Sequence, residues 1–196
     1  MKLVLASKNA HKLVEMKDIL SQLGVEVVLE SEAGVDVDVE ETGATFEENA
    51  YLKAHAVMEA SGLPAIADDS GLCVDALNGA PGVYSARYGG PGLDDAGRYQ
   101  LLLENMRGQL DRRCKFVSAI CCCFPNGDMV EARGECAGTL AYAPKGADGF
   151  GYDPIFFVPG LKKTFAELSP EEKNAISHRG NALKAFREKL ETYLKK

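Results

Sequence analysis

The stretch KLVLASKNAHKLVEMKDILSQLGVEVVL, Lys2 to Leu29, predicts a strand, a helix and a second strand in that order. Residues 2–6 and 25–29 are short apolar runs of the kind that form buried strands. Between them, apolar side chains recur every three or four residues until Gly24, where a helix would stop. They are Leu13, Met16, Ile19, Leu20 and Leu23. A strand–helix–strand opening favours a mixed α/β sheet.

The middle of the chain continues this alternation. Residues 45–62 predict a helix, because Thr45 and Glu48 fit a capping box and Gly62 fits a helix stop. We expect a strand to follow from Pro64 to Ala67 and another helix over 94–108.

The second half of the chain predicts a β-hairpin instead of alternating strands and helices. Residues 114–138 read as two strands around the turn 125–128, and this hairpin suggests a second lobe. A short helix is expected after Ser169, and a longer one from about Ser177. The apolar face of that longer helix is predicted to hold Ala182, Leu183, Phe186, Leu190 and Leu194.

Length, hydrophobic content and net charge indicate a globular protein and disfavour a membrane protein or a nucleic-acid-binding protein. The chain has 196 residues, 46% of them hydrophobic, which is enough for a sizeable core. No run approaches a signal-peptide core or the roughly 20 apolar residues of a membrane span, so we expect a soluble protein with no membrane partner. The net charge of −7 disfavours a broad nucleic-acid surface.

The six cysteines favour a reducing compartment. Cys121, Cys122 and Cys123 are consecutive, and neighbours in a strand point to opposite faces, so they cannot all form sensible disulfides. We interpret them as buried thiols in the cytoplasm, with a metal at the Cys121–Cys123 pair as the minority alternative.

Four stretches carry candidate chemistry, and the first is AIADDSGLCV, residues 65–74. It places Asp68 and Asp69 inside an apolar run, where an ionised carboxylate needs a cation or hydrogen-bond donors. We expect the pair where the strand from Pro64 to Ala67 runs into a loop, a usual location for α/β active sites. The alternative is that an aspartate here only caps a turn beside Ser70.

The second stretch, SKNAHK at residues 7–12, joins the first strand to the first helix. Free N–H groups at a helix start, together with Lys8 and Lys12, would suit a phosphate. The alternative is that Ser7 or Asn9 only caps the helix and the lysines are solvated. Glu40 and Glu41 add acidic oxygens that, near phosphates, would imply Mg²⁺, unless they form only an exposed turn.

The third and fourth stretches are GFGYDPIFF at 149–157 and EEKNAISHRG at 171–180. Glycines around Phe150 and Tyr152 would let an aromatic ring stack on a base, although an aromatic turn of the core fits equally well. Lys173, His178 and Arg179 are close in sequence and could bind substrate, or could form a surface corner between helices.

With these stretches in order, the chain closely resembles the inosine triphosphate pyrophosphatase family, the Ham1-like or dITP/XTP pyrophosphatases, over nearly its whole length. The matching residues are Ser7, Asn9 and Lys12, followed by EETGATFEENAYLKA, LPAIADDSGLCVDALNGAPGVYSARY, GFGYDPIFF and SHRGNALK. The resemblance implies an α/β fold with an elongated, curved mixed sheet flanked by helices, in which two lobes of one domain, residues 1–196, hold a nucleotide in a central cleft. It also implies a homodimer.

The resemblance further implies hydrolysis of ITP, dITP and XTP to the monophosphate and pyrophosphate, with Mg²⁺, or alternatively Mn²⁺, as cofactor. Asp69 would be the general base, and it would hold the metal with Glu41 or Glu40. The implied substrate contacts are Ser7, Lys8, Asn9, Ala10, His11 and Lys12, then Lys53 and Ser70, and on the purine side Phe150, Gly151, Tyr152, Asp153, Lys173, His178 and Arg179.

One departure concerns the first loop. The family often has glycine before the loop lysine, where this chain has His11, and Lys8 occupies a variable position. The alternatives are a Maf-like nucleotide pyrophosphatase with other base preferences and a non-enzymatic phospho-acceptor module. The phospho-acceptor module fits poorly, because such domains have no place for the hairpin half.

Overall fold

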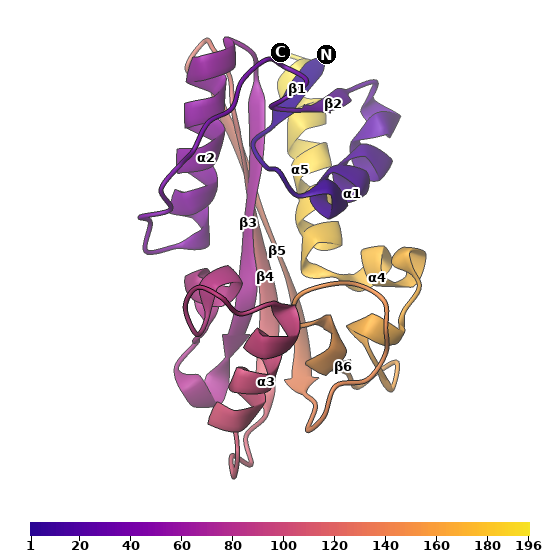
Figure 1. Ribbon diagram of the computed structural model, residues 1–196. Coiled ribbons are helices and arrows are strands. Elements are labelled where there is room, and N and C mark those ends of the chain that lie inside the picture. The colour runs from indigo at the N-terminus through magenta and orange to yellow at the C-terminus, as the bar shows by residue number, and fades with distance from the viewer. The chain divides into compact units, whose positions relative to one another are not determined.

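The computed structural model describes all residues, 1–196, and contains one open seven-stranded sheet with helices on its faces (Figure 1). The helices are α1 (Ala10–Leu20), α2 (Phe46–Ser61), α3 (Asp95–Asn105), α4 (Pro170–Ile176) and α5 (His178–Leu194). The strands are β1 (Lys2–Leu5), β2 (Glu26–Leu29), β3 (Ala65–Val74), β4 (Arg113–Cys123), β5 (Met129–Leu140), β6 (Phe156–Val158) and β7 (Lys163–Thr164). Their order in the sheet is β2-β1-β3-β4-β5-β6-β7.

The expected mixed sheet is confirmed by its pairing. β1 lies parallel to β2, with Leu3 opposite Val27, and it also lies parallel to β3. At the other edge, β6 is antiparallel to both β5 and β7. The β1–β3 pairing extends over only two positions, Val4 with Ala65 and Leu5 with Ile66, so β3 continues beyond the end of its neighbour.

Local sequence signals explain where the first helices begin and end. The Asn9 side chain accepts hydrogen bonds from the N–H groups of His11 and Lys12 and so caps α1. Thr45 caps α2 by accepting from the N–H of Glu48, as predicted, and Gly62 ends the helix in the left-handed conformation. The Glu48 carboxylate, however, accepts from the Ala44 N–H rather than completing a capping box on Thr45.

The chain divides into two compact units, each described separately below. Unit 1 comprises Met1–Asp69, Ser118–Gly134 and Arg179–Lys196, and unit 2 comprises Ser70–Val117 and Glu135–His178. The chain therefore crosses from one unit to the other within β3, β4 and β5. The description of residues 1–196 as one two-lobed domain stays a prediction.

Unit 1 has three layers. α1 and α5 cover one face of the strands, with Met16, Leu20 and Phe186 fully buried against them, and α2 covers the opposite face through Ala50, Ala54 and Val57 (Figure 1). The cysteine run follows the strand alternation that we predicted, because Cys122 packs with the α1 and α5 face while Cys121 and Cys123 pack with the α2 face. All six cysteines are free thiols.

Unit 2 has its own core, built around aromatic side chains. Phe116 of β4, Phe156 of β6 and Phe165 contact one another, with ring centroids 4.5–5.6 Å apart. Leu102 and Met106 from α3 and its C-terminal end are fully buried in the same cluster.

No helix is both long and apolar enough to cross a membrane.

One expectation was wrong. Asp68 and Asp69 do not mark the start of a loop, because β3 continues to Val74. The strand can continue because cations and a hydroxyl meet these carboxylates. In the terminal helix, four of the five residues predicted on the apolar face are fully buried, and Leu194, the last residue of α5, is 46% exposed.

Candidate active site

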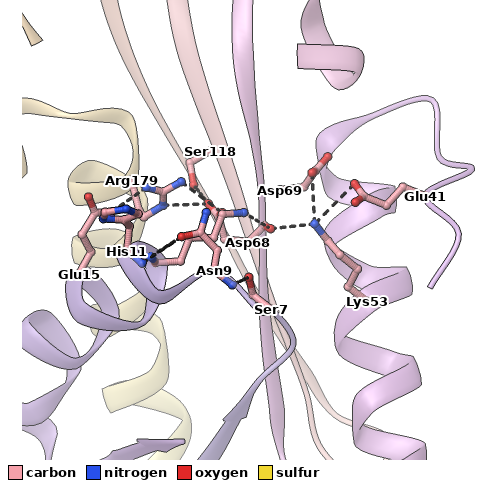
Figure 2. Close-up of polar contacts among 11 residues, drawn as sticks. Ser7, Asn9, His11, Glu15, Glu41, Lys53, Asp68, Asp69, Ser118 and Arg179 are labelled. Carbon is pink, nitrogen blue, oxygen red and sulfur yellow. Dashed lines mark hydrogen bonds and ion pairs between the residues drawn. The ribbon is translucent and has the colours of Figure 1, made fainter. Parts of the chain in front are cut away.

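Asp68 and Asp69 lie next to each other on β3, yet their side chains point to opposite faces of the sheet. Asp68 lies on the face covered by α1 and α5, whereas Asp69 lies on the α2 face (Figure 2). Strand alternation accounts for this difference. Both residues lie just beyond Leu5, where β1 ends. They therefore occupy the carboxyl edge of a parallel strand pair, although β3 itself continues.

The Asp68 carboxylate is surrounded by donors. Lys12 Nζ lies 2.6 Å from Oδ1, Ser118 Oγ donates to Oδ2 at 2.5 Å, and the Arg179 guanidinium approaches both oxygens at 3.5 Å. Burial alone would raise the pKa of Asp68, but the charges of Arg179 and Lys12 outweigh it and hold the pKa well below its ordinary value. Asp68 is therefore an ionised, fully paired carboxylate.

Two lysines converge on the backbone carbonyl of Asp68. Lys12 Nζ donates to this oxygen at 3.2 Å and Lys53 Nζ at 3.0 Å. The first comes from α1 and the second from α2, so the carbonyl brings together ammonium groups from both sides of the sheet. Burial lowers the pKa of Lys12, and Asp68 opposes this effect. Paired ammonium groups at one place favour the binding of a polyanion.

Asp69 is much less well paired. Its Oδ1 lies 3.3 Å from Lys53 Nζ, while its Oδ2 is buried and has no hydrogen-bond partner. Lys53 Nζ also lies 3.6 Å from the Glu41 carboxylate, so Glu41 and Asp69 approach the same ammonium (Figure 2). Burial raises the pKa of Asp69 to about 6, and the nearby Glu41 charge adds to this effect while Lys53 opposes it. A carboxylate of this kind can accept a proton near neutral pH.

The donor set around Asp69 fits a hard cation. Mg²⁺ is typically bound by one or two carboxylates, with water and substrate phosphates completing its ligands. Glu41 and Asp69 provide two carboxylates, and the unpartnered Oδ2 supplies an open oxygen. Glu40 is exposed and forms no ion pair, so of the two glutamates only Glu41 is brought to this place. No group of three or more potential metal-binding side chains is gathered in the chain.

The loop from Ser7 to Lys12 combines capping and charge. Ser7 Oγ accepts from the N–H of Asn9, whose own side chain caps α1, and Ala10 and His11 are exposed in the first turn. Lys8 points elsewhere and pairs with Asp36 at 2.7 Å, with both side chains largely exposed. Lys12, in contrast, pairs with the Asp68 carboxylate.

Arg179 lies on the Asp68 side of this site. Besides Asp68, it contacts the Glu15 carboxylate at 2.6 Å and is almost completely buried. Glu15 and Ser118 are site residues that were not predicted from the sequence. A polar Ser118 within the apolar run of β4 was a signal that could have been used, whereas nothing local distinguishes Glu15 from a solvated helix residue.

Unit 2 gathers three of the residues expected on the purine side. Lys173 Nζ lies 2.8 Å from the Asp153 carboxylate and 4.6 Å from the centre of the Phe150 ring, and Asp153 accepts from the Phe150 N–H. Gly149 permits this turn, because its φ is +75° and a Cβ there would clash with the Asp153 carboxylate. The arrangement holds one face of Phe150 against an ammonium.

The other residues of unit 2 that were expected to bind substrate mainly contact other parts of the protein. The Tyr152 hydroxyl donates to the Ser85 carbonyl at 2.6 Å, and the Gly151 N–H donates to Asp95 at 2.9 Å. His178 is buried and stacked on Phe116, with centroids 4.5 Å apart. Ser70 follows Asp69 on β3 and is half-buried.

Comparison with known proteins agrees with these features. A profile of the Ham1 family matches residues 3–189. A dITP/XTP pyrophosphatase from Clostridium perfringens is 46% identical over 99% of both chains, and one from Haemophilus influenzae is 50% identical over 96% of this chain and 98% of its own. The solved Ham1 protein of Staphylococcus aureus is 45% identical, with a TM-score of 0.90 over 98% of this chain and 100% of its own.

Proposed function

The chain belongs to the Ham1 family, and we propose that it hydrolyses the deaminated purine nucleotides dITP, ITP and XTP to the monophosphate and pyrophosphate. Relatives that are 46–50% identical over nearly the whole chain carry the name dITP/XTP pyrophosphatase, which supports this substrate class. The observation that carries the proposal is the under-paired Asp69 carboxylate beside Lys53 and Glu41, with two lysines converging on the adjacent carbonyl.

Asp69 is proposed as the general base. In the reaction, a water oxygen forms a bond to the α-phosphorus, the bond from that phosphorus to the α–β bridging oxygen breaks, and pyrophosphate leaves. Asp69 accepts the proton of the attacking water. Its buried Oδ2, which has no hydrogen-bond partner, supports this role, because a base needs an oxygen that is open to accept the proton.

Lys12 and Lys53 are proposed to bind the phosphates. Both ammonium groups already lie together at the Asp68 carbonyl, so charge developing on the departing pyrophosphate would be met without moving either side chain far. Asp68 keeps Lys12 in this place through its carboxylate. Ser7, Asn9, Ala10 and His11 would add backbone and side-chain donors at the start of α1, while Lys8 would contribute charge from a greater distance.

Mg²⁺ is the cofactor that this site would hold, with Mn²⁺ as an alternative ion of similar preference for oxygen. Asp69 and Glu41 are its proposed ligands, and the unpartnered Asp69 Oδ2 supports that assignment. When bound, the ion would neutralise phosphate charge. Lys53 would then share the carboxylates with the ion and remain available to a phosphate oxygen.

Selection of the base is proposed for Phe150, Asp153, Lys173, His178 and Arg179. Hypoxanthine and xanthine carry a 6-keto acceptor where adenine carries a 6-amino donor, so donors placed for the keto oxygen would be left unpaired by adenine. The ammonium of Lys173 against Phe150 supports a built recognition element in unit 2. Gly151, Tyr152 and Ser70 are also proposed to contact the substrate. The homodimer and the cytoplasmic location stay predictions.

The decisive experiment measures pyrophosphate release from dITP, XTP, dGTP, dATP, dTTP and UTP at equal concentrations, with Mg²⁺ and with EDTA. We expect rapid, metal-dependent release from dITP and XTP and little from the others. Preference for dTTP or UTP would instead indicate a Maf-like specificity. No release from any nucleotide would overturn the proposed activity.

A further inference from the structure

Asn49 is a fully buried amide in the first turns of α2, and it holds the segment that carries Glu41. Its Oδ1 accepts from the Gly43 N–H at 2.7 Å. The neighbouring Glu48 carboxylate accepts from the Ala44 N–H at 2.6 Å. Two successive N–H groups of the incoming segment are therefore fixed by side chains of one helix.

Gly43 is required for this close approach. A Cβ at that position would lie 2.6 Å from Asn49 Oδ1 and 2.7 Å from Glu48 Cβ, distances that real Cβ atoms essentially never show. The Asn49 and Glu48 side chains are held by the hydrogen bonds just described, so they could not move without breaking them. The glycine therefore matters here for its missing side chain.

The segment that carries Glu41 is a loop. Residues 35–43 belong to no helix or strand, so no ladder of backbone hydrogen bonds fixes them. Glu41 is only two residues before Gly43, and Asn49 lies one helical turn before Lys53 on the same face of α2. The Asn49 contact thus ties the Glu41 segment to the helix that also presents Lys53.

The second atom of the amide supports this interpretation. Asn49 Nδ2 is buried and has no hydrogen-bond partner. Leaving a buried donor unpaired is unfavourable, and an apolar side chain of similar size would avoid that loss. What the amide contributes is therefore its oxygen on Gly43, which fixes the orientation of the amide group.

We propose that Asn49 is a positioning residue for the reaction: by holding Gly43 it keeps the Glu41 carboxylate beside Lys53 and Asp69, where the divalent cation binds. The inference rests on the proposed function for its catalytic meaning. Residues that orient a metal ligand without touching the metal typically change metal affinity by about 10–100-fold when they are replaced.

The test compares Asn49→Leu, which removes the acceptor but keeps the volume, with Val57→Ala as a matched control. Val57 is buried two turns further along α2, and its truncation weakens packing without touching Gly43. Mn²⁺ binding to the nucleotide-free protein is measured by electron paramagnetic resonance. Hydrogen exchange is measured in the peptide that contains Gly43, and melting temperatures are recorded for all proteins.

We expect Asn49→Leu to weaken Mn²⁺ binding by about 10-fold or more and to speed amide exchange at Gly43. Val57→Ala should lower the melting temperature while changing neither. If Asn49→Leu folds poorly, Gly43→Ala serves as the second variant, because it leaves the buried amide in place. It should show the same weaker Mn²⁺ binding. Mn²⁺ affinity within twofold of the unaltered chain in both variants would overturn the inference.

The same measurements separate the inference from the proposed function. Normal Mn²⁺ binding with no pyrophosphate release from dITP would overturn the proposed activity, while the positioning of Glu41 would still be decided by the Asn49→Leu comparison. No Mn²⁺ binding by the unaltered chain would overturn the inference even if dITP were hydrolysed.

Discussion

The two faces of β3 give two neighbouring aspartates opposite surroundings. On the α1 and α5 side, Asp68 meets Lys12, Arg179 and Ser118 and is fully paired. On the α2 side, Asp69 meets only Lys53, and one of its oxygens is buried without a partner. The pKa shifts have opposite signs, lowered for Asp68 and raised for Asp69. One carboxylate is fully paired, and the other has an oxygen without a hydrogen-bond partner.

Replacing Asp69 by asparagine tests the reactive side and should have the largest effect. The variant keeps the shape but cannot accept a proton, so we expect kcat for dITP to fall by roughly a thousandfold or more. Circular dichroism and the melting temperature should show a folded protein. Turnover within tenfold of the unaltered chain would remove Asp69 as the base.

Replacing Asp68 by asparagine tests the paired side. Lys12 would then be buried without a counter-charge and Arg179 would lose one of its two carboxylate partners, so we expect the free energy of unfolding to fall by about 3 kcal/mol or more. Activity should also fall, because Lys12 loses its anchor. Urea unfolding at pH 7 measures the first effect. A variant as stable as the unaltered chain would show that Asp68 is not the structural member of the pair.

The sequence predicted the elements around this pair better than the pair itself. Helical spacing from Leu13 to Leu23 and the Thr45 and Gly62 signals identified α1 and α2, because these patterns are local. The end of a strand before Asp68 was predicted because two acids in an apolar run resemble a loop. The counter-charge that lets β3 continue, Arg179, is 111 residues away in sequence, so no local pattern could reveal it.

The candidate site shows the same difference between local sequence patterns and contacts between residues far apart in the chain. Lys12, Glu41 and Asp69 were named from their local patterns and Lys53 from the family resemblance, and the structure brings them together. Glu15 and Ser118 were missed because they act only through contacts with Arg179 and Asp68. Such supporting residues depend on tertiary packing and leave little trace in the pattern of a single chain.

The pH dependence of stability should differ between the two aspartate variants in metal-free protein. The raised pKa of Asp69 means that its ionisation opposes folding, so its unfavourable contribution grows as the pH rises from about 4 to about 6 and is complete above that range. Asp69→Asn should therefore be more stable than the unaltered chain at pH 7, by on the order of 2 kcal/mol, and equal to it near pH 4.

Asp68→Asn should show the opposite trend. The lowered pKa of Asp68 means that its stabilising contribution is present above the ordinary aspartate pKa and is lost as the pH falls below it. Unfolding in urea with EDTA, at several values from about pH 2 to pH 7.5, measures both variants. Parallel curves for the two variants would contradict the contrast between the two faces.

The smallest effect is expected at Lys8, which lies outside this contrast. Its side chain is 67% exposed and pairs with an Asp36 that is more exposed still, and pairs of this kind contribute about 0–1 kcal/mol and are screened by salt. Lys8→Ala should therefore raise the KM for dITP by no more than about threefold, and by less at higher ionic strength. Lys12→Ala, the matched loop variant, should reduce kcat/KM far more, because Lys12 is held at the acidic pair. A tenfold or larger effect of Lys8→Ala that persists in high salt would show that Lys8 leaves Asp36 to bind phosphate directly.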